Sequence, residues 1–444
     1  MEILIPEYVR EILSKLNTSG YEAYPVGGCV RDTLLGKAPD DWDVCTNALP
    51  EQMEEVFGDC HVIETGLMHG TLTVLTDGLP VEVTTYRSDG VYTDHRRPDK
   101  VEFVSSLKED LSRRDLTINA LCLDSKGTVI DMFDGIEDLE KKLIRCVGDA
   151  KKRFEEDALR ILRALRFSSV LDFDIDEYTS LAVCEKAPLL KYVSPERIYA
   201  ELKKLLCGKR AGRILLEYAD VFSQFIPEIA PCIGCVQNNP HHKYDVLAHI
   251  CKSIDNIEPT PTLRLTMLLH DIAKPGCKTT DENGIDHFKM HPVVGAKAAE
   301  EILTRLRADN DTKDKVCELI KEHDNRFPAT KRSVGRFISK HGYAFFDDYI
   351  KVRYADACAQ SQYHREEKLS HLEGVIKIRR ELEAQSACLT VKDLSIGGND
   401  LLALGFKGRQ IGETLRAALE AVIDEEIHND KKELLAFVSE YLKK

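Results

Sequence analysis

Two polar stretches near the N-terminus combine residue types suited to phosphate and metal chemistry. The first places Gly27, Gly28 and Arg31 between a strand-like apolar run and a short amphipathic segment. Glycines let a phosphate approach the backbone, a helix start favours an anion, and arginine adds a fork of donors. In the second, Asp41 and Asp43 are two residues apart in a strand-like segment, so their carboxylates can share divalent cations. This order predicts a triphosphate site beside a two-metal nucleotidyl transfer site.

A second group of potential metal ligands lies beyond residue 240. Seven of the fourteen histidines fall between His241 and His323. Among them, His270 and Asp271 are adjacent at the end of an apolar helical segment, 263–269, where the two side chains diverge only partly and can bind metal together. Histidine and carboxylate ligands suit Mn, Ni, Co, Fe or Mg, so the residue types leave the metal open.

The elements that must position the first group alternate between helix and strand. Apolar residues recur at helical spacing over 3–16, and 50–57 also indicates a short helix. Strand-like segments follow at 61–63, 71–75 and 81–85, and an Asp-Gly pair between the last two is a hairpin signal. The pattern therefore predicts a small mixed α/β unit at the start of the chain.

These motifs resemble those of the class II tRNA nucleotidyltransferases, which include CCA-adding enzymes and bacterial poly(A) polymerases. The resemblance rests on VGGCVRDTLLG with the downstream DDWD, on RRDLTINA at 113–120 and on EDALRILRALR at 156–166. It implies a series of residues that bind the incoming nucleotide. These residues are Gly27, Gly28, Arg31, Arg114, Asp115, Asn119, Asp157, Arg160, Arg163 and Arg166.

The resemblance also implies how the head would work. Asp41 and Asp43 would bind Mg²⁺, and Glu82 would be the third carboxylate, placed to help deprotonate an attacking 3′-hydroxyl. In RRDLTINA, the arginine would contact phosphate, and the aspartate or asparagine would contact the ribose. The segment at 131–139 resembles the next family element, which connects the head to the rest of the chain.

Asp157 and Arg160 are candidates for selecting the base of the nucleotide. We expect a helix over about 151–170, which would place these two side chains on one face about a turn apart. An ordinary i,i+3 salt bridge would contribute only a few tenths of a kcal/mol. The alternative is a protein template, in which the arginine donates to a ring acceptor and the aspartate accepts from an exocyclic amine, a pair that cytosine and adenine both offer. Arg163 and Arg166 repeat the spacing and would reach phosphate or the primer end.

The histidine-rich region resembles the HD phosphohydrolase superfamily. The H…HD…D pattern and two further histidines match the ligands of its bimetallic members, which implies a divalent metal and hydrolysis of phosphomonoesters or phosphodiesters. A retained helical scaffold with an inactive site is the alternative. The implied ligands are His249, His270, Asp271, His291, His323 and Asp356.

Length and composition indicate several domains in a cytoplasmic protein. The 444 residues are too many for one core, the hydrophobic content is 43%, and no apolar run is long enough to span a membrane. The fold class we expect is α+β, a small mixed α/β nucleotidyltransferase head followed by largely all-α parts. The predicted division is a head at 1–140, a neck and body at 141–235, an HD domain at 236–365 and a tRNA-binding tail at 366–444.

Charge distribution is compatible with RNA as a partner, although the net charge is −14. Residues 141–166 carry nine Lys or Arg against four Asp or Glu, and residues 191–213 carry seven against two. Basic stretches of this kind can hold RNA at one place on an acidic protein, but they are also common as solvated surface. The expected partners are tRNA, CTP and ATP, with neither DNA nor a membrane.

The function implied by the resemblance is template-independent addition of CCA to the 3′ end of tRNA. A polar loop at 86–100 matches the position of a loop associated with switching from C to A, which favours the complete activity. Partial enzymes that add only A or only CC, and poly(A) polymerases, remain alternatives, although 65–71 lacks the basic pair and phenylalanine of the poly(A) branch. An HD hydrolase with an RNA-binding head is an alternative of a different class.

Overall fold

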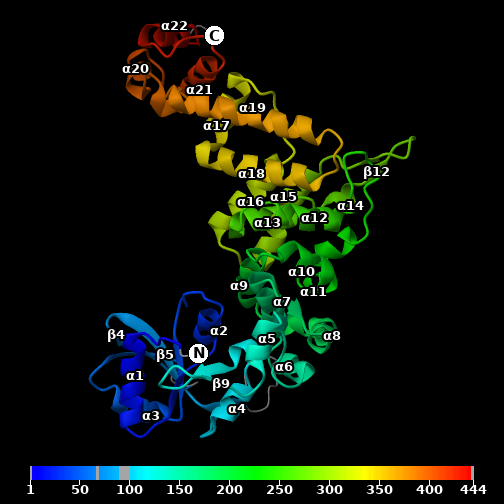
Figure 1. Cartoon of the computed structure of the whole chain (residues 1–444). Coiled ribbons are helices and arrows are strands. Elements are labelled where there is room, and N and C mark those ends of the chain that lie inside the picture. The colour runs from blue at the N-terminus through cyan, green and yellow to red at the C-terminus, as the bar shows by residue number, and fades with distance from the viewer. Residues whose placement is uncertain (1–2, 67–69, 90–100, 442–444) are drawn as a thin grey trace. The chain divides into compact units, whose positions relative to one another are not determined.

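The computed structural model describes residues 3–66, 70–89 and 101–441, which form two compact units (Figure 1). The first unit comprises Met1–Ala230 with Arg305–Ala308, and the second comprises Pro231–Thr304 with Asp309–Lys444. Most of the polar loop predicted at 86–100 lies outside the described residues, as does the centre of the segment at 65–71.

The first unit begins with a mixed five-stranded sheet in the order β1-β2-β5-β4-β3. Strands β2 and β5 run parallel, and the other neighbours are antiparallel. The sheet forms here because alternate residues such as Leu72, Val74, Val81 and Val83 are buried while their neighbours face the other way. The strands are β1 (Ala23–Pro25), β2 (Asp43–Thr46), β3 (His61–Gly66), β4 (Thr71–Thr76) and β5 (Leu79–Thr85).

The helices predicted at 3–16 and 50–57 are present as α1 (Glu7–Thr18) and α3 (Pro50–Val56). Helix α1 buries Val9, Ile12 and Leu16, whose spacing places them on one face. Between β1 and β2, Gly27 adopts a φ of 86° and leads into α2 (Gly28–Leu34). The predicted strand, glycine turn and helix are therefore confirmed.

The remainder of the first unit is mainly helical. One prediction is wrong here: the helix expected over 151–170 is broken at Asp157, which has extended backbone angles (φ −133°, ψ 105°) between two helices. The helices are α4 (Leu107–Ser112), α5 (Gly135–Glu140), α6 (Ala150–Glu156), α7 (Leu159–Leu171), α8 (Glu177–Lys186), α9 (Pro195–Leu206), α10 (Ala211–Glu217) and α11 (Ala219–Phe222). The strands are β6 (Arg87–Asp89), β7 (Val101–Phe103), β8 (Leu121–Leu123), β9 (Val129–Asp131), β10 (Leu143–Ile144) and β11 (Asp174–Ile175).

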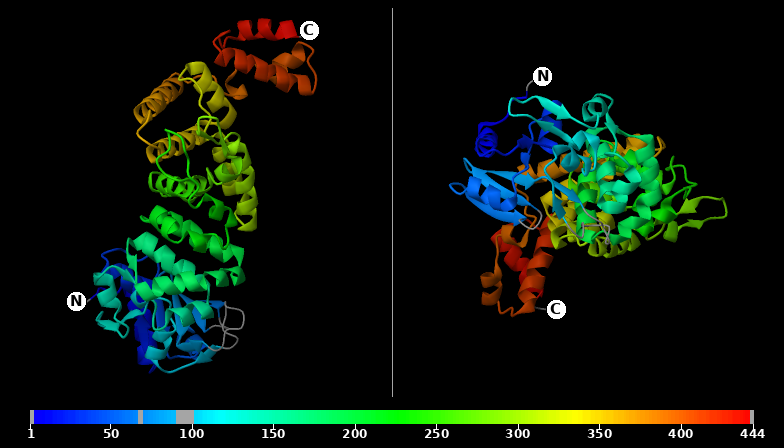
Figure 2. Two further views of the ribbon diagram at one scale, coloured as in Figure 1. Left: turned by 90° about the vertical axis from the view of Figure 1, so that its right-hand side faces the viewer. Right: turned by 90° about the horizontal axis from the view of Figure 1, so that it is seen from below.

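The second unit consists of helices and one small hairpin (Figure 2). Helix α12 packs on α13 and α18, and α13 also packs on α16. Its helices are α12 (Val246–Asp255), α13 (Pro261–Leu269), α14 (Lys274–Cys277), α15 (His291–Arg305), α16 (Asn310–Glu322), α17 (Lys331–His341), α18 (Tyr343–Ala359), α19 (Arg365–Ala384), α20 (Gly398–Ala403), α21 (Arg409–Ile423) and α22 (Lys431–Tyr441). The hairpin is formed by β12 (Thr279–Thr280) and β13 (Asp286–His287).

The α+β fold class is confirmed, since a small mixed sheet precedes a long helical region. The finer division into head, neck and body, HD domain and tail stays a prediction. Within the residues that the structure describes, no helix combines the length and the apolar character needed to cross a bilayer.

Candidate active sites

Three predicted catalytic carboxylates lie close together in the head. Asp43 is the first residue of β2 and is aligned with Glu82 of the parallel strand β5, so both side chains leave the same face of the sheet. Asp41 lies in the loop that enters β2 and is exposed. Burial raises the pKa of Asp43 to about 6, and the negative charges of Asp41 and Glu82 add to this effect, while Arg114 opposes it. The negative charges of Asp41 and Glu82 beside Asp43 form a site that a divalent cation can neutralise.

The side chains of Arg114 and Arg31 lie against the glycine turn. A Cβ on Gly27 would lie 3.1 Å from Nη1 of Arg114, so a glycine leaves room for that side chain. Arg31 is buried and donates from Nε and Nη2 to Asp32, at 2.9 and 2.8 Å. Its Nη1 donates to Oδ1 of Asn119 at 2.5 Å. The predicted nucleotide-binding arginine is therefore held in place by protein groups.

Asp115 and Asn119 link this turn to helix α7. The amide of Asn119 donates to Oδ1 of Asp115 at 3.2 Å, and Arg163 on α7 donates from Nε and Nη2 to Oδ2, both at 2.6 Å. Burial alone would raise the pKa of Asp115, but the charge and hydrogen bonds of Arg163 outweigh burial and lower it. Four predicted residues thus form one chain of hydrogen bonds from Arg31 to Arg163.

The two candidates for base selection differ from the predicted geometry. Because the helix breaks at Asp157, this residue and Arg160 are not on one continuous helix. The Asp157 carboxylate accepts hydrogen bonds from Arg197 on α9 at 2.8 and 3.4 Å. Arg160 donates to Glu156 at 2.8 Å and to the backbone oxygen of Arg113 at 2.8 Å. Arg160 thus lies beside the RRDLTINA segment, and each of the two side chains is positioned by its own partner.

Sequence reasoning missed two of the residues that hold these side chains. Arg197 lies in the first turn of α9, which begins at Pro195. Glu201, one turn further along α9, pairs with Nε of Arg166 at 2.8 Å. The four-residue spacing of Arg197 and Glu201 places them on one face of a helix, which is the signal that could have indicated a partner surface for α7.

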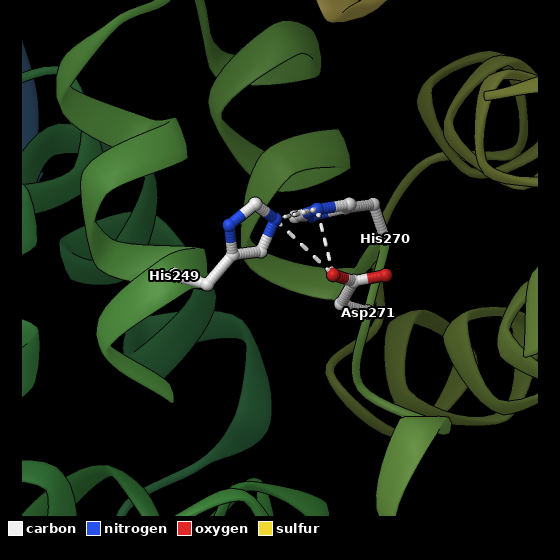
Figure 3. A group of neighbouring side chains, drawn as sticks. All are labelled: His249, His270 and Asp271. Carbon is white, nitrogen blue, oxygen red and sulfur yellow. Dashed lines mark hydrogen bonds and ion pairs between the residues drawn. The ribbon is translucent and has the colours of Figure 1, made fainter. Parts of the chain in front are cut away.

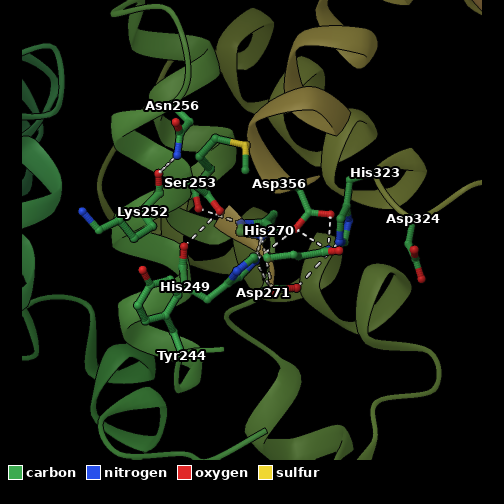
Figure 4. A network of polar contacts seen from close by, with 12 residues as sticks. Tyr244, His249, Lys252, Ser253, Asn256, His270, Asp271, His323, Asp324 and Asp356 are labelled. Carbon is green, nitrogen blue, oxygen red and sulfur yellow. Dashed lines mark hydrogen bonds and ion pairs between the residues drawn. The ribbon is translucent and has the colours of Figure 1, made fainter. Parts of the chain in front are cut away.

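All six predicted ligands of the histidine-rich region converge at one buried place in the second unit. Figure 3 shows His249 on α12 turned toward His270 and Asp271, which directly follow α13. Figure 4 shows His323 and Asp356 at the same place. His291 begins α15, His323 follows α16, and Asp356 lies on α18. The set is His249, His270, Asp271, His291, His323 and Asp356.

Three of these histidines are oriented by backbone carbonyl groups. Nδ1 of His270, His291 and His323 hydrogen-bonds to the backbone oxygen three residues earlier, at 2.8, 2.7 and 2.6 Å. Each Nδ1 must then carry the proton, which leaves the Nε2 lone pair free to bind a metal. The Nε2 atoms of all three point toward Asp271.

The Asp271 carboxylate lies between two pairs of histidines. Its Oδ2 is 3.2 Å from Nε2 of His249 and 3.3 Å from Nε2 of His270. Its Oδ1 is 3.4 Å from Nε2 of His291 and 3.7 Å from Nε2 of His323. Both oxygens are buried. The residues therefore fit divalent cations, which the four histidines would hold together with Asp271, and Asp356 lies beside the first pair.

In the absence of metal, burial and neighbouring carboxylates shift the pKa values of histidines at this site. Burial opposes protonation of His249, but hydrogen bonds to Asp271 and Asp356 outweigh burial and raise its pKa to about 9. Burial also dominates for His242, a neighbour outside the ligand set, and lowers its pKa to about 3. A cation that binds here must displace a proton from His249.

A cavity of about 270 Å³ opens onto this centre and carries several cationic side chains. Lys274 is buried and lies 2.6 Å from Oδ2 of Asp271 and 3.0 Å from Oε1 of Gln237. Lys289 and Arg326 line the same cavity. Positive groups around a metal centre suit an anionic substrate such as a phosphate ester.

The fold and the head carboxylates define a nucleotidyltransferase of the polymerase type. Residues 23–145 match the family described as the poly A polymerase head domain, and 172–233 match the probable RNA and SrmB-binding site of polymerase A. Residues 282–438 match the family described as tRNA nucleotidyltransferase domain 2, putative.

Comparison with known proteins identifies the particular family. The chain is 34% identical to the CCA-adding enzyme of Leuconostoc mesenteroides over 442 residues, which cover 98% of this chain and 96% of that protein. The match to the CCA-adding enzyme of Limosilactobacillus reuteri is 53% identical over 203 residues, or about half of each chain (46% and 50%). The crystal structure of the Bacillus stearothermophilus CCA-adding enzyme in complex with CTP superposes with a TM-score of 0.70 and 28% identity, covering 99% and 98% of the two chains. The chain belongs to the family of CCA-adding enzymes, which are tRNA nucleotidyltransferases.

Proposed function

We propose that this chain adds the 3′-terminal CCA to tRNA from CTP and ATP. The observation that carries the proposal is the alignment of Asp43 with Glu82, beside Asp41, next to the glycine turn and Arg114. The relatives described as CCA-adding enzymes, one of them in complex with CTP, support the same substrates.

In this proposal Asp41 and Asp43 hold Mg²⁺, which when bound would neutralise the triphosphate and lower the pKa of the attacking 3′-hydroxyl. Glu82 is placed to accept the proton of that hydroxyl. Arg114 binds the phosphates, and Asp115 and Asn119 bind the ribose. The hydroxyl oxygen forms a bond to the α-phosphorus of the nucleotide, and pyrophosphate leaves.

Base selection in this proposal uses Asp157 and Arg160. Arg197 orients the first, and Glu156 and a backbone oxygen orient the second, so both present fixed polar edges. An arginine donor and a carboxylate acceptor match cytosine and adenine, whereas uracil and guanine present an N–H at the ring position. A good pair of this kind discriminates between bases by about 1 to 3 kcal/mol.

The test is incorporation of labelled CTP and ATP into three tRNAs that end before CCA, after C and after CC, with Mg²⁺. Completion of all three supports the full activity, whereas extension of only some would make the chain an A-adding or CC-adding enzyme, and long A tails would make it a poly(A) polymerase. Asp41→Ala is expected to abolish incorporation and to leave tRNA binding nearly intact. Asp40→Ala is the matched control, because this neighbour is also exposed.

We also propose that the second unit is a metal-dependent phosphohydrolase. The convergence of four histidine Nε2 atoms on the two oxygens of Asp271 favours this activity, and the cationic cavity favours a phosphomonoester or phosphodiester substrate. Mn, Ni, Co, Fe and Mg are the candidate metals. Hydrolysis of a 2′,3′-cyclic nucleotide should be lost in Asp271→Asn while CCA addition continues, and the reverse is expected for Asp41→Ala. Loss of both activities in Asp271→Asn would contradict two independent sites.

A further inference from the structure

A hydrogen-bond network outside the six predicted ligands holds Asp356. Gln360 lies directly after α18 and is only 7% exposed. Its Nε2 donates to both carboxylate oxygens of Asp356, at 3.1 Å to Oδ1 and 2.9 Å to Oδ2. The Oδ1 atom is also 3.0 Å from Nε2 of His249. Gln360 therefore contacts the metal-facing carboxylate without belonging to the ligand set.

The orientation of the Gln360 amide is set by Lys368, which lies on α19. Lys368 donates from Nζ to Oε1 of Gln360 at 2.5 Å. Because an ammonium group can only donate, the amide oxygen must face Lys368, and the NH₂ group must face Asp356. A flipped amide would place its oxygen against a carboxylate and an NH₂ group against an ammonium, so it is disfavoured at both ends.

The backbone around Gln360 is fixed as well. The guanidinium of Arg365 donates to the backbone oxygen of Gln360. The next residue, Ser361, donates from its backbone N–H to His241 at 3.0 Å and from Oγ to Pro240 at 2.6 Å. The amide therefore cannot move away from Asp356 without breaking contacts to two other segments.

We propose that Gln360 and Lys368 are positioning residues of the histidine and aspartate centre, and that they hold Asp356 in the orientation that binds metal. The inference rests on the metal site proposed above. Partners that orient a ligand typically contribute 10-fold to 100-fold to metal affinity. We expect this range for Gln360, which touches the ligand, and a smaller loss for Lys368, which acts through Gln360.

The experiment is calorimetric titration of the metal-stripped full-length chain with Mn²⁺. The variants Gln360→Met and Lys368→Met keep the side-chain length and remove the hydrogen bonds. Lys368→Arg restores a cationic donor, and Lys377→Met removes an exposed lysine from the same helix as the matched control. The expected loss is about 10-fold to 100-fold for Gln360→Met and several-fold for Lys368→Met, with Lys368→Arg and the control near wild type.

Two readouts separate this role from plain structural support. Thermal unfolding is measured on each variant and CCA addition on Gln360→Met, and both should stay near wild type where Mn²⁺ affinity falls. Affinity of Gln360→Met within about twofold of wild type would refute the positioning role. If the wild-type chain binds Mn²⁺ no better than Asp271→Asn, the proposal of a metal site at these residues is refuted, and this inference fails with it.

Discussion

Asp43→Asn should stabilise the head while removing a metal ligand. In the metal-free protein, burial and the charges of Asp41 and Glu82 raise the pKa of Asp43 to about 6, from an ordinary value of 3.8. Asparagine resembles the protonated carboxyl group, so the variant avoids the cost of ionising this side chain inside the folded head. Without a bound cation, the ionised Asp43 therefore lowers the free energy of unfolding of the head.

The magnitude follows from the difference in pKa. The shift from 3.8 to about 6 corresponds to about 3 kcal/mol at about 1.4 kcal/mol per pKa unit, or about 2 kcal/mol after allowance for solvent at a half-buried side chain. Because the folded state binds this proton more tightly, wild type loses stability as pH rises from 3.8 to about 6, and the deficit persists above that window. The difference in free energy of unfolding between the variant and wild type should be complete at about pH 7.5 and fall to about a third of that value near pH 4.5.

The assay uses Trp42, the single tryptophan of the chain, which is buried next to Asp43. Urea unfolding followed by its fluorescence, in EDTA, reports on the head even if the second unit unfolds separately. Asp40→Asn is the control, since this exposed neighbour should change stability by less than about 0.5 kcal/mol. An Asp43→Asn variant that is no more stable than wild type at about pH 7.5, or whose gain does not change with pH, would refute the reasoning. Added Mg²⁺ should stabilise wild type and have little effect on the variant.

Further predictions concern the packing of the first unit and one helix of the second unit. Arg163→Ala leaves Asp115 buried without its charged partner, and we expect a loss of about 2 kcal/mol in urea unfolding, since the arginine is partly exposed. Gly135→Ala would place a Cβ 2.5 Å from the backbone oxygen of Thr117, so a cost of about 1 to 3 kcal/mol and a lower melting temperature are expected. Gly412→Ala has open space around the new methyl group and should instead stabilise its helix by about 0.5 kcal/mol.

Much of the head was predictable because its candidate site residues are close together in the sequence. The glycine turn and the carboxylates at 41 and 43 are local features, and the strand that follows positions them. The break at Asp157 was not predictable from periodicity, since the apolar spacing of α7 continues that of α6. Two contacts of the Asp157 carboxylate accompany the break: it accepts from Leu159 N at 3.1 Å, which is a local cap of α7, and from Arg197, forty residues away. The second of these contacts is tertiary and could not be found from periodicity.

The histidine-rich site was predictable for a different reason. Its ligands occupy helix ends or helix faces, where the backbone geometry largely fixes the direction of each side chain. The residues that contact these ligands could not be predicted in the same way. Gln360 and Lys368 are ordinary polar residues, and their proposed roles depend on how α18 and α19 pack. Pattern reasoning finds the atoms that bind a metal more readily than the atoms that orient them.

The two proposed centres differ in donor chemistry, and this difference has a consequence for metal use. The head site offers only carboxylate oxygens, which suit the hard cation Mg²⁺. The second site offers four imidazole nitrogens around the Asp271 carboxylate, and these donors would favour transition metals over Mg²⁺. In the head, burial and the charges of Asp41 and Glu82 raise the pKa of Asp43. At the second site, the charges of His270 and Lys274 and the hydrogen bonds from histidines outweigh burial and hold the pKa of Asp271 well below its ordinary value. The two proposed sites would therefore favour different metals, because each is built from donors that the other's metal does not prefer.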